Sequence, residues 1–256
     1  MKLGSYAIIR LAIGLLPAGA QMWLPWIAAI SVMNIIYGGF VAMAQKDLKL
    51  IIGYSSSSHM GYVLLGIACL TPLALDGAVL LMFAHGLMTA LAFAIIGQLY
   101  DQTHTRYLPD LGGLAHQAPF IAVCGVIAAM ASSGLPGFAN FVAELLIFLG
   151  GWDRYPVQTI CGVFGVVITA VYMLRLVRGT FFGPSKPAYE HHVHDATSAF
   201  ARMPFVILVL ALLIVGSWPK PILRLIDVSA RPLVNAIVQP ETVNAAEARL
   251  GETGHP

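Results

Sequence analysis

Long apolar runs cover most of this chain, separated by short breaks that contain charged residues, glycine or proline. A helix needs about 20 apolar residues to cross a bilayer. The runs predict seven candidate spans, at 3–16, 22–45, 48–70, 73–99, 119–150, 156–183 and 203–218. From Pro219 onward the sequence is mixed, which indicates a short surface helix and a tail. The pattern therefore predicts an all-α, polytopic membrane protein with a transmembrane helix bundle over 1–218 and a surface segment over 219–256.

Composition narrows the class of protein further. Of the 256 residues, 58% are hydrophobic and only 10% are charged, whereas a soluble domain carries about 25% charge. These values exclude a soluble enzyme, a nucleic-acid-binding domain and a disordered chain. The net charge of +2 is too small to indicate a polyanionic partner. The three cysteines, Cys69, Cys124 and Cys161, lie in apolar runs without CxxC spacing, which predicts packing rather than disulfides or a metal site.

The basic residues between the spans predict an orientation. Those in the second, fourth and sixth connections are Lys46, Lys49, Arg106, Arg178, Lys186 and Arg202, whereas the odd connections carry only Arg154. Basic loops stay in the cytoplasm, so the first helix should run from inside to outside. The basic residues that follow the last span, Lys220, Arg224 and Arg231, depart from this pattern.

Two of the runs have unusual lengths. The first has about 14 residues before Pro17, too few to span comfortably, so we expect this helix to begin earlier in a longer ancestor. The fifth is too long for one span and is interrupted by SSGLPGFAN, from Ser132 to Asn140. Unwound backbone at membrane depth marks transport sites in many carriers. A simple packing kink is the alternative.

Few ionisable residues lie inside the spans, and we interpret them as a proton relay. Glu144 is the one acid within a span and shares a helical face with Asn140; a desolvated carboxylate holds a proton more easily. His59, which follows four serines, and His85, beside Gly86, are the histidines in spans. The alternatives are a structural ion pair for Glu144 and core packing for the histidines.

Two lysines complete the candidate relay of Lys2, Lys49, His59, His85 and Glu144. A buried lysine releases its proton more readily than an exposed one, although Lys49 could instead extend to the membrane surface. The loop histidines, His191, His192 and His194, indicate a solvated loop more than a metal site. No dinucleotide, phosphate-loop, haem or iron–sulfur motif occurs in the sequence, which predicts a proton path without redox chemistry of its own.

Several stretches resemble the second half of an antiporter-like subunit of respiratory complex I, the proton-pumping NADH:quinone oxidoreductase. They are MKLGSYAIIR, AMAQKDLKLIIGYSSSSHMGYVLLGI, GAVLLMFAHGLMTALAFAIIGQLYDQTHTR, DLGGL and GLPGFANFVAELLIF. The resemblance extends from Lys2 to about Gly183, more weakly through the last span, and is greater to subunit M (chain 4) than to the other antiporter-like subunits.

The resemblance implies a fold and a set of roles. Members of that family have fourteen helices in two inverted repeats, each with a broken helix, and the spans here would be the eighth to fourteenth. Lys2 would match the lysine of the central channel, His59 and His85 the histidines that link it outward, and Glu144 the ionisable residue near the exit. Lys49 matches a motif lysine of less defined role. FMN, iron–sulfur clusters and quinone would belong to partner subunits, with other membrane-arm subunits as neighbours in a bacterial-type inner membrane.

The family's first repeat has no counterpart here. An incomplete sequence, a subunit split into two chains and a genuine remnant all remain open, and a split would require a separate chain for the missing half. Other functions also remain open: a subunit of a Mrp-type cation/proton antiporter, a subunit of a membrane-bound hydrogenase, or a structural remnant that does not pump. A retinal protein is disfavoured because the span at 203–218 contains no lysine.

Overall fold

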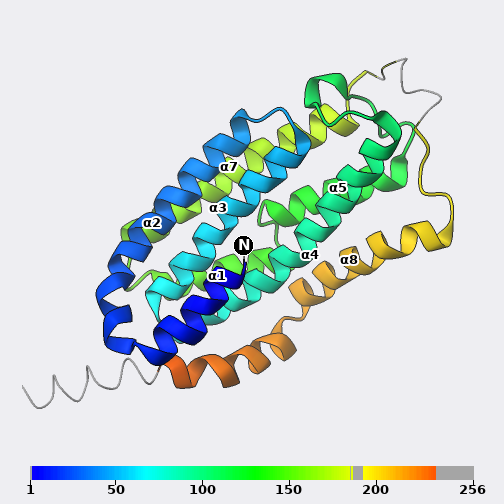
Figure 1. Ribbon diagram of the computed structural model, residues 1–256. Helices are drawn as coiled ribbons and strands as arrows, with labels where there is room; N and C mark the ends of the chain where they lie inside the picture. The colour runs from blue at the N-terminus through cyan, green and yellow to red at the C-terminus, as the bar shows by residue number, and fades with distance from the viewer. Residues whose placement is uncertain (1, 185, 187–192, 235–256) are drawn as a thin grey trace, which may run out of the picture.

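The computed structural model describes residues 2–184, 186 and 193–234, which form a bundle of helices (Figure 1). His191 and His192 of the loop cluster lie outside these residues. The helices in chain order are α1 (Lys2–Ala7), the π-helical η1 (Ile8–Ile13), α2 (Pro17–Ala44), α3 (Leu48–Cys69), α4 (Pro72–Thr103), the short 3₁₀ helix η2 (Leu108–Asp110), α5 (Pro119–Ser132), α6 (Ala139–Gly151), α7 (Pro156–Phe181), α8 (Ala199–Ser217) and a helix over 220–234.

Local sequence signals explain where several helices begin. Proline occupies the first position of α2, α4, α5 and α7, where its missing N–H has no intrahelical partner to lose. Asp47 caps α3, because its Oδ1 accepts from the backbone N–H of Lys49 at 2.8 Å. Asp195 caps α5 from a distant part of the chain, and its carboxylate accepts from the N–H groups of Phe120 and Ile121 at 2.9 and 3.3 Å.

Helix α3 is the centre of the bundle. It packs against α1, α2, α4, α6 and α7, and most of its residues are buried. In Figure 1, α2, α3 and α7 lie along one side of α4 and α5, and α8 runs along the opposite side. Helix α4 contacts α5, α6 and α8 as well as α3. The polar middle of α3 is thereby enclosed by other helices on several sides.

Four helices in the described part of the chain are long and apolar enough to cross a membrane: α2, α4, α7 and α8. The all-helical membrane class is confirmed, whereas the count of seven spans is not. Helix α3 has 22 residues, but Ser55 to Ser58 and His59 make it more polar than those four. It can carry these residues because neighbouring helices cover it. The first run forms only α1 and η1, ending at Ile13, and is as short as expected.

The fifth run is divided into two helices. α5 ends at Ser132 and α6 begins at Ala139, with Pro136 in the connection. Gly134 and Gly137 adopt positive φ angles of 65° and 102° there, a region that other residues rarely enter. Both helices are shorter than a span, with 14 and 13 residues. The interruption that the sequence predicts is therefore present, and it ends within reach of α3.

The segment after α8 includes a helix over 220–234, as the sequence predicts for the start of the surface segment. Residues of this helix line a cleft together with Tyr6, Ile9 and Arg10 of the first two helices and with α4. The division of the chain into 1–218 and 219–256 stays a prediction, because 235–256 lie outside the described residues.

Candidate functional site

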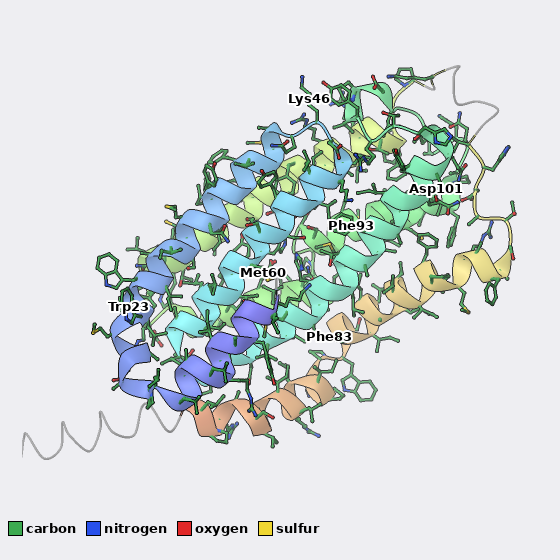
Figure 2. The ribbon with its side chains drawn as sticks, in the orientation of Figure 1. Trp23, Lys46, Met60, Phe83, Phe93 and Asp101 are labelled. Carbon is green, nitrogen blue, oxygen red and sulfur yellow. The ribbon has the colours of Figure 1, made fainter. Side chains whose placement is uncertain are left out.

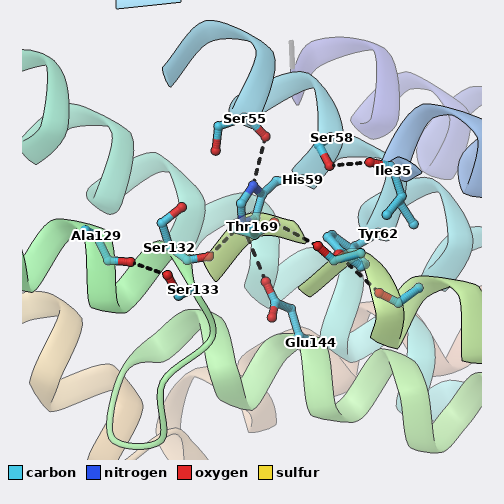
Figure 3. Close-up of polar contacts among 12 residues, drawn as sticks. Ile35, Ser55, Ser58, His59, Tyr62, Ala129, Ser132, Ser133, Glu144 and Thr169 are labelled. Atoms are coloured by element: carbon cyan, nitrogen blue, oxygen red, sulfur yellow. Dashed lines mark hydrogen bonds and ion pairs between the residues drawn. The ribbon is translucent and has the colours of Figure 1, made fainter. Parts of the chain in front are cut away.

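His59 lies in the middle of α3 and is fully buried. Its Nδ1 lies 2.8 Å from the carbonyl oxygen of Ser55, and its Nε2 lies 3.1 Å from the carbonyl oxygen of Ser132 (Figure 3). Ser132 is the last residue of α5, and the last carbonyls of a helix have no intrahelical partner. The break between α5 and α6 therefore supplies an acceptor to the imidazole of His59.

The oxygen atoms near the ring nitrogens of His59 are hydrogen-bond acceptors. Besides the two carbonyls, the Glu144 carboxylate lies near, with Oε1 3.6 Å from Nε2. A neutral imidazole has one N–H and can donate to only one of the two carbonyls, whereas a doubly protonated ring can donate to both. The geometry thus accommodates a proton on either ring nitrogen, or on both, without any movement of the backbone.

Glu144 reaches His59 from α6, one helical turn after Asn140, and is 4% exposed. The connection between α5 and α6 closes over its other oxygen. A Cβ atom at Gly134 would lie 2.7 Å from Oε2 of Glu144, closer than carbon and oxygen can approach. Glycine at this position therefore serves two needs, the positive φ angle of the turn and the room for the carboxylate.

His85 and Lys2 lie near His59 as well. The rings of His85 and His59 are 5.0 Å apart between centroids, at an angle of 48°. The Nζ of Lys2 lies 3.6 Å from the point that a Cβ at Gly86 would occupy, so the ammonium group sits beside the residue next to His85. His85, His59 and Glu144 are thus neighbours, and Lys2 lies next to Gly86. These four residues come from α1, α4, α3 and α6, and we call them the row.

Lys49 lies apart from this row, so its membership of the relay stays a prediction. It is exposed at the first turn of α3. Its position ten residues before His59 corresponds to about 15 Å along the helix axis. Lys49 has this position because Asp47 caps α3 and so starts the helix at the end of the bundle. Oδ2 of Asp47 also lies 3.6 Å from Nε of Arg106. The structure therefore places Lys49 on the surface, where its side chain can reach a membrane boundary.

The serines before His59 join α3 to its neighbours. The hydroxyl of Tyr172, on α7, lies within hydrogen-bond distance of Ser55 Oγ at 2.8 Å and of Thr169 Oγ1 at 3.3 Å, and its one proton can be donated to either of them. Ser58 Oγ donates to the carbonyl of Ile35 on α2 at 2.8 Å. These bonds hold the helical turn that carries His59 between α2 and α7.

Sequence reasoning missed Tyr172 and the carbonyl of Ser132. A tyrosine in an apolar run looks like a core residue, and nothing in a sequence marks which backbone carbonyl will face a histidine. The run of serines was the available signal for interhelical hydrogen bonds. It indicates hydroxyl contacts without saying which helices supply the partners.

Several buried polar atoms around the row have no hydrogen-bond partner among the residues that the structure describes. They are both ring nitrogens of His85, Oγ of Ser132 and both amide atoms of Asn140. Within the same residues, no group of three or more His, Cys, Asp or Glu side chains is arranged to hold a metal ion. Unpaired polar groups in an interior are typically satisfied by ordered water.

Comparison with known proteins gives the family. A family model described as NADH:quinone oxidoreductase/Mrp antiporter, TM matches residues 1–169. An NAD(P)H-quinone oxidoreductase chain 4 from Acaryochloris marina is 39% identical over 256 residues, which cover 96% of this chain and 47% of that protein. The chain thus spans about half the length of the curated relatives it matches.

Solved structures agree with the sequence comparison. A chain in respiratory complex I from Thermus thermophilus with bound NADH matches with a TM-score of 0.86 and 32% identity, over 92% of this chain and 50% of that one. A chain of the Mrp complex from Dietzia sp. matches with a TM-score of 0.82 over 92% of this chain and 52% of that one. At 23% identity the second match shows the fold alone. The resemblance noted in the sequence is confirmed, and the chain belongs to the NADH:quinone oxidoreductase/Mrp antiporter transmembrane family.

Proposed function

We propose that this chain translocates protons as a membrane-arm subunit of an NADH:quinone oxidoreductase, through Lys2, His85, His59 and Glu144. The observation that carries the proposal is the position of His59, buried between the ring of His85 at 5.0 Å and the carboxylate of Glu144 at 3.6 Å. Ionisable residues inside a membrane protein are costly and are retained mainly for function. A row of four, contributed by four different helices, is hard to explain by packing.

The proposed path runs from Lys2 to Glu144. Lys2 gives its proton to His85, and His85 passes it to His59. His59 accepts the proton on one ring nitrogen and releases a proton from the other. The two nitrogens lie at different helices, with Nδ1 at the Ser55 carbonyl of α3 and Nε2 at the Ser132 carbonyl of α5. Where the side chains do not touch, water can bridge them. The unpaired polar atoms of His85, Ser132 and Asn140 are suited to bind such water.

In this proposal the redox chemistry takes place elsewhere. FMN, the iron–sulfur clusters and quinone belong to partner subunits, and electron transfer there drives the proton movement here. The partners are the other membrane-arm subunits, with a separate chain as a possible source of the other half. We place the subunit in a bacterial-type inner membrane. It would cross that membrane seven times, with α5 and α6 as one broken crossing and α1 with η1 as part of another.

Two other functions are weighed against this one. The fold of the Mrp complex chain, at a TM-score of 0.82, supports a subunit of a cation/proton antiporter as the second candidate, and a membrane-bound hydrogenase subunit is related to it. The higher identity to the complex I chain, 32% against 23%, favours the first proposal. The genes adjacent to this one distinguish the assemblies. A structural remnant that does not pump is the third possibility.

Replacement of Glu144 tests the proposal. In the purified complex that contains this chain, reconstituted in liposomes, Glu144→Gln keeps the shape of the side chain and removes the acid. We expect proton flux through this chain to fall on the order of 100-fold, the lower part of the range for a positioned proton-transfer group. The readout is the number of protons pumped for each NADH oxidised.

The matched control is Asp153→Asn, which makes the same chemical change at an exposed acid. It should leave the ratio of protons to electrons unchanged. If Glu144→Gln pumps as well as the control while the complex remains intact, the path does not use Glu144. In that case a structural role for the chain becomes the better account.

A further inference from the structure

A groove at one end of the bundle has a chemistry unlike that of the proton path. It has a volume of about 750 Å³ and lies between the last turns of α7 and the segment around η2. Among the described residues, its lining includes three basic side chains, Arg175, Arg178 and Lys186, and no acid. Asp110 belongs to η2 but is not among the lining residues. The groove therefore concentrates positive charge.

Two of the three basic groups are fixed in place by backbone carbonyls. Arg175 donates to the carbonyl oxygens of Met43 and Gln45 at the end of α2, and Lys186 donates to that of Pro109. These contacts orient the side chains but do not neutralise their charge. The side chain of Arg178 is exposed, and it makes no hydrogen bond or ion pair with any residue that the structure describes. As far as those residues go, its five N–H donors can bind an anionic ligand.

The walls of the groove are apolar and open to the outside. Leu174 and Phe182 line it, although they are 65% and 52% exposed. A soluble anion would gain nothing from these walls, whereas the acyl chains of a lipid would cover them. Charge next to exposed apolar surface thus fits an amphipathic ligand with an anionic head.

The position of the groove in the bundle agrees with such a ligand. Lys46, Lys49 and Arg106 lie at the same end, in the connections that the charge pattern assigns to the cytoplasm. Basic pockets between transmembrane helices on the cytoplasmic side bind the head groups of anionic lipids. The groove has that composition.

We propose that this groove binds an anionic phospholipid, with the phosphate at Arg175, Arg178 and Lys186 and the acyl chains along Leu174 and Phe182. Arg178 is the main contact with the phosphate because its guanidinium is free to form a bidentate pair. The proposal does not depend on the proton path. It concerns the last turns of α7, which follow Tyr172 along the chain.

The test is native mass spectrometry of the purified complex that contains this chain. The complex is titrated with phosphatidylglycerol, with phosphatidylcholine and with inorganic phosphate, and bound lipid is counted on the released chain. We expect phosphatidylglycerol to be retained over phosphatidylcholine. Arg178→Gln should lower the retained phosphatidylglycerol about fivefold, the effect of one basic residue near a membrane surface. Arg178→Lys should lower it less, because the charge remains.

The control is Lys46→Gln, which removes one positive charge at the same end of the bundle (Figure 2) but outside the groove. It should leave lipid retention unchanged. The proposal is overturned if Arg178→Gln and Lys46→Gln retain the same amount of phosphatidylglycerol, or if phosphatidylcholine is retained equally. It is also overturned if inorganic phosphate displaces the lipid, because the groove would then recognise a free anion. Proton pumping is measured separately, so neither result decides the other proposal.

Discussion

The middle and the beginning of α3 both carry ionisable residues, but the residue in the middle is buried and the one at the beginning is exposed. In the middle, His59 is enclosed by α4, α5 and α6, and both ring nitrogens face oxygen atoms. At the beginning, Lys49 is exposed next to Asp47, whose carboxylate caps the helix and lies near Arg106. An ionisable residue becomes a candidate for proton transfer when other helices bring partners to it.

The two regions should therefore respond differently to substitution. Loss of a group in the middle interrupts a path that has few members. Loss of a charge at the beginning removes a solvent-exposed contact of small energetic value, since exposed ion pairs contribute about 0–1 kcal/mol. The following predictions test this contrast, in order of decreasing effect.

The largest contrast is expected between the two lysines. Lys2→Gln removes the charge beside His85 and should lower proton flux through the chain on the order of 100-fold, as expected for loss of a proton donor. Lys49→Gln should leave flux unchanged, because Lys49 lies on the surface. Both are measured as protons pumped per NADH oxidised in reconstituted liposomes. Equal losses for the two variants would show that Lys49 belongs to the path despite its position.

Gly134→Ala should disturb the site from the connection between α5 and α6. Alanine at a φ of 65° costs about 1–2 kcal/mol, and its Cβ would press on Oε2 of Glu144. We expect a lower unfolding temperature and a several-fold loss of proton flux as the carboxylate moves away from His59. Gly53→Ala, where a Cβ meets no atom within 4 Å, is the control. It should leave the flux unchanged and should not lower the unfolding temperature, because alanine favours a helix over glycine. If Gly134→Ala keeps both its unfolding temperature and its proton flux, the connection between α5 and α6 accommodates the added methyl group and this prediction is contradicted.

Tyr172→Phe should have the smallest effect. It removes the hydrogen bonds to Ser55 Oγ and Thr169 Oγ1, each worth about 1 kcal/mol. We expect a small drop in unfolding temperature and a minor change in flux, because Tyr172 holds α3 in place without belonging to the row. Tyr37→Phe, at a side chain that is 67% exposed, should leave both unchanged. A loss of flux as large as that of Lys2→Gln would make Tyr172 a member of the path.

Much of the fold could be predicted from the apolar runs. Their lengths identify α2, α4, α7 and α8 directly, and SSGLPGFAN marks the division between α5 and α6. The count of seven crossings could not be fixed in the same way. Serines make the middle of α3 polar, and only the packing of neighbouring helices explains how such a helix remains inside the bundle.

The candidate site was partly visible in the sequence. His59, His85 and Glu144 are distinctive because they interrupt apolar runs, and such residues are costly in a membrane. Lys2 and Lys49 are both lysines near the start of a helix, and the surface alternative was open only for Lys49. The packing of α1 against α3 brings Lys2 next to Gly86. The carbonyl of Ser132 could not be predicted, because every residue has one and its role depends on where α5 ends.

The central claim is that His59 and Glu144 belong to one proton path, and a double-substitution cycle tests it most directly. Proton flux is measured in the intact complex for His59→Gln, Glu144→Gln and the double variant. Residues that act in one path give non-additive losses. The account therefore predicts that the proton flux of the double variant equals that of the single variant with the lower flux. If the two losses multiply, His59 and Glu144 act independently, and the proposed path through both is contradicted.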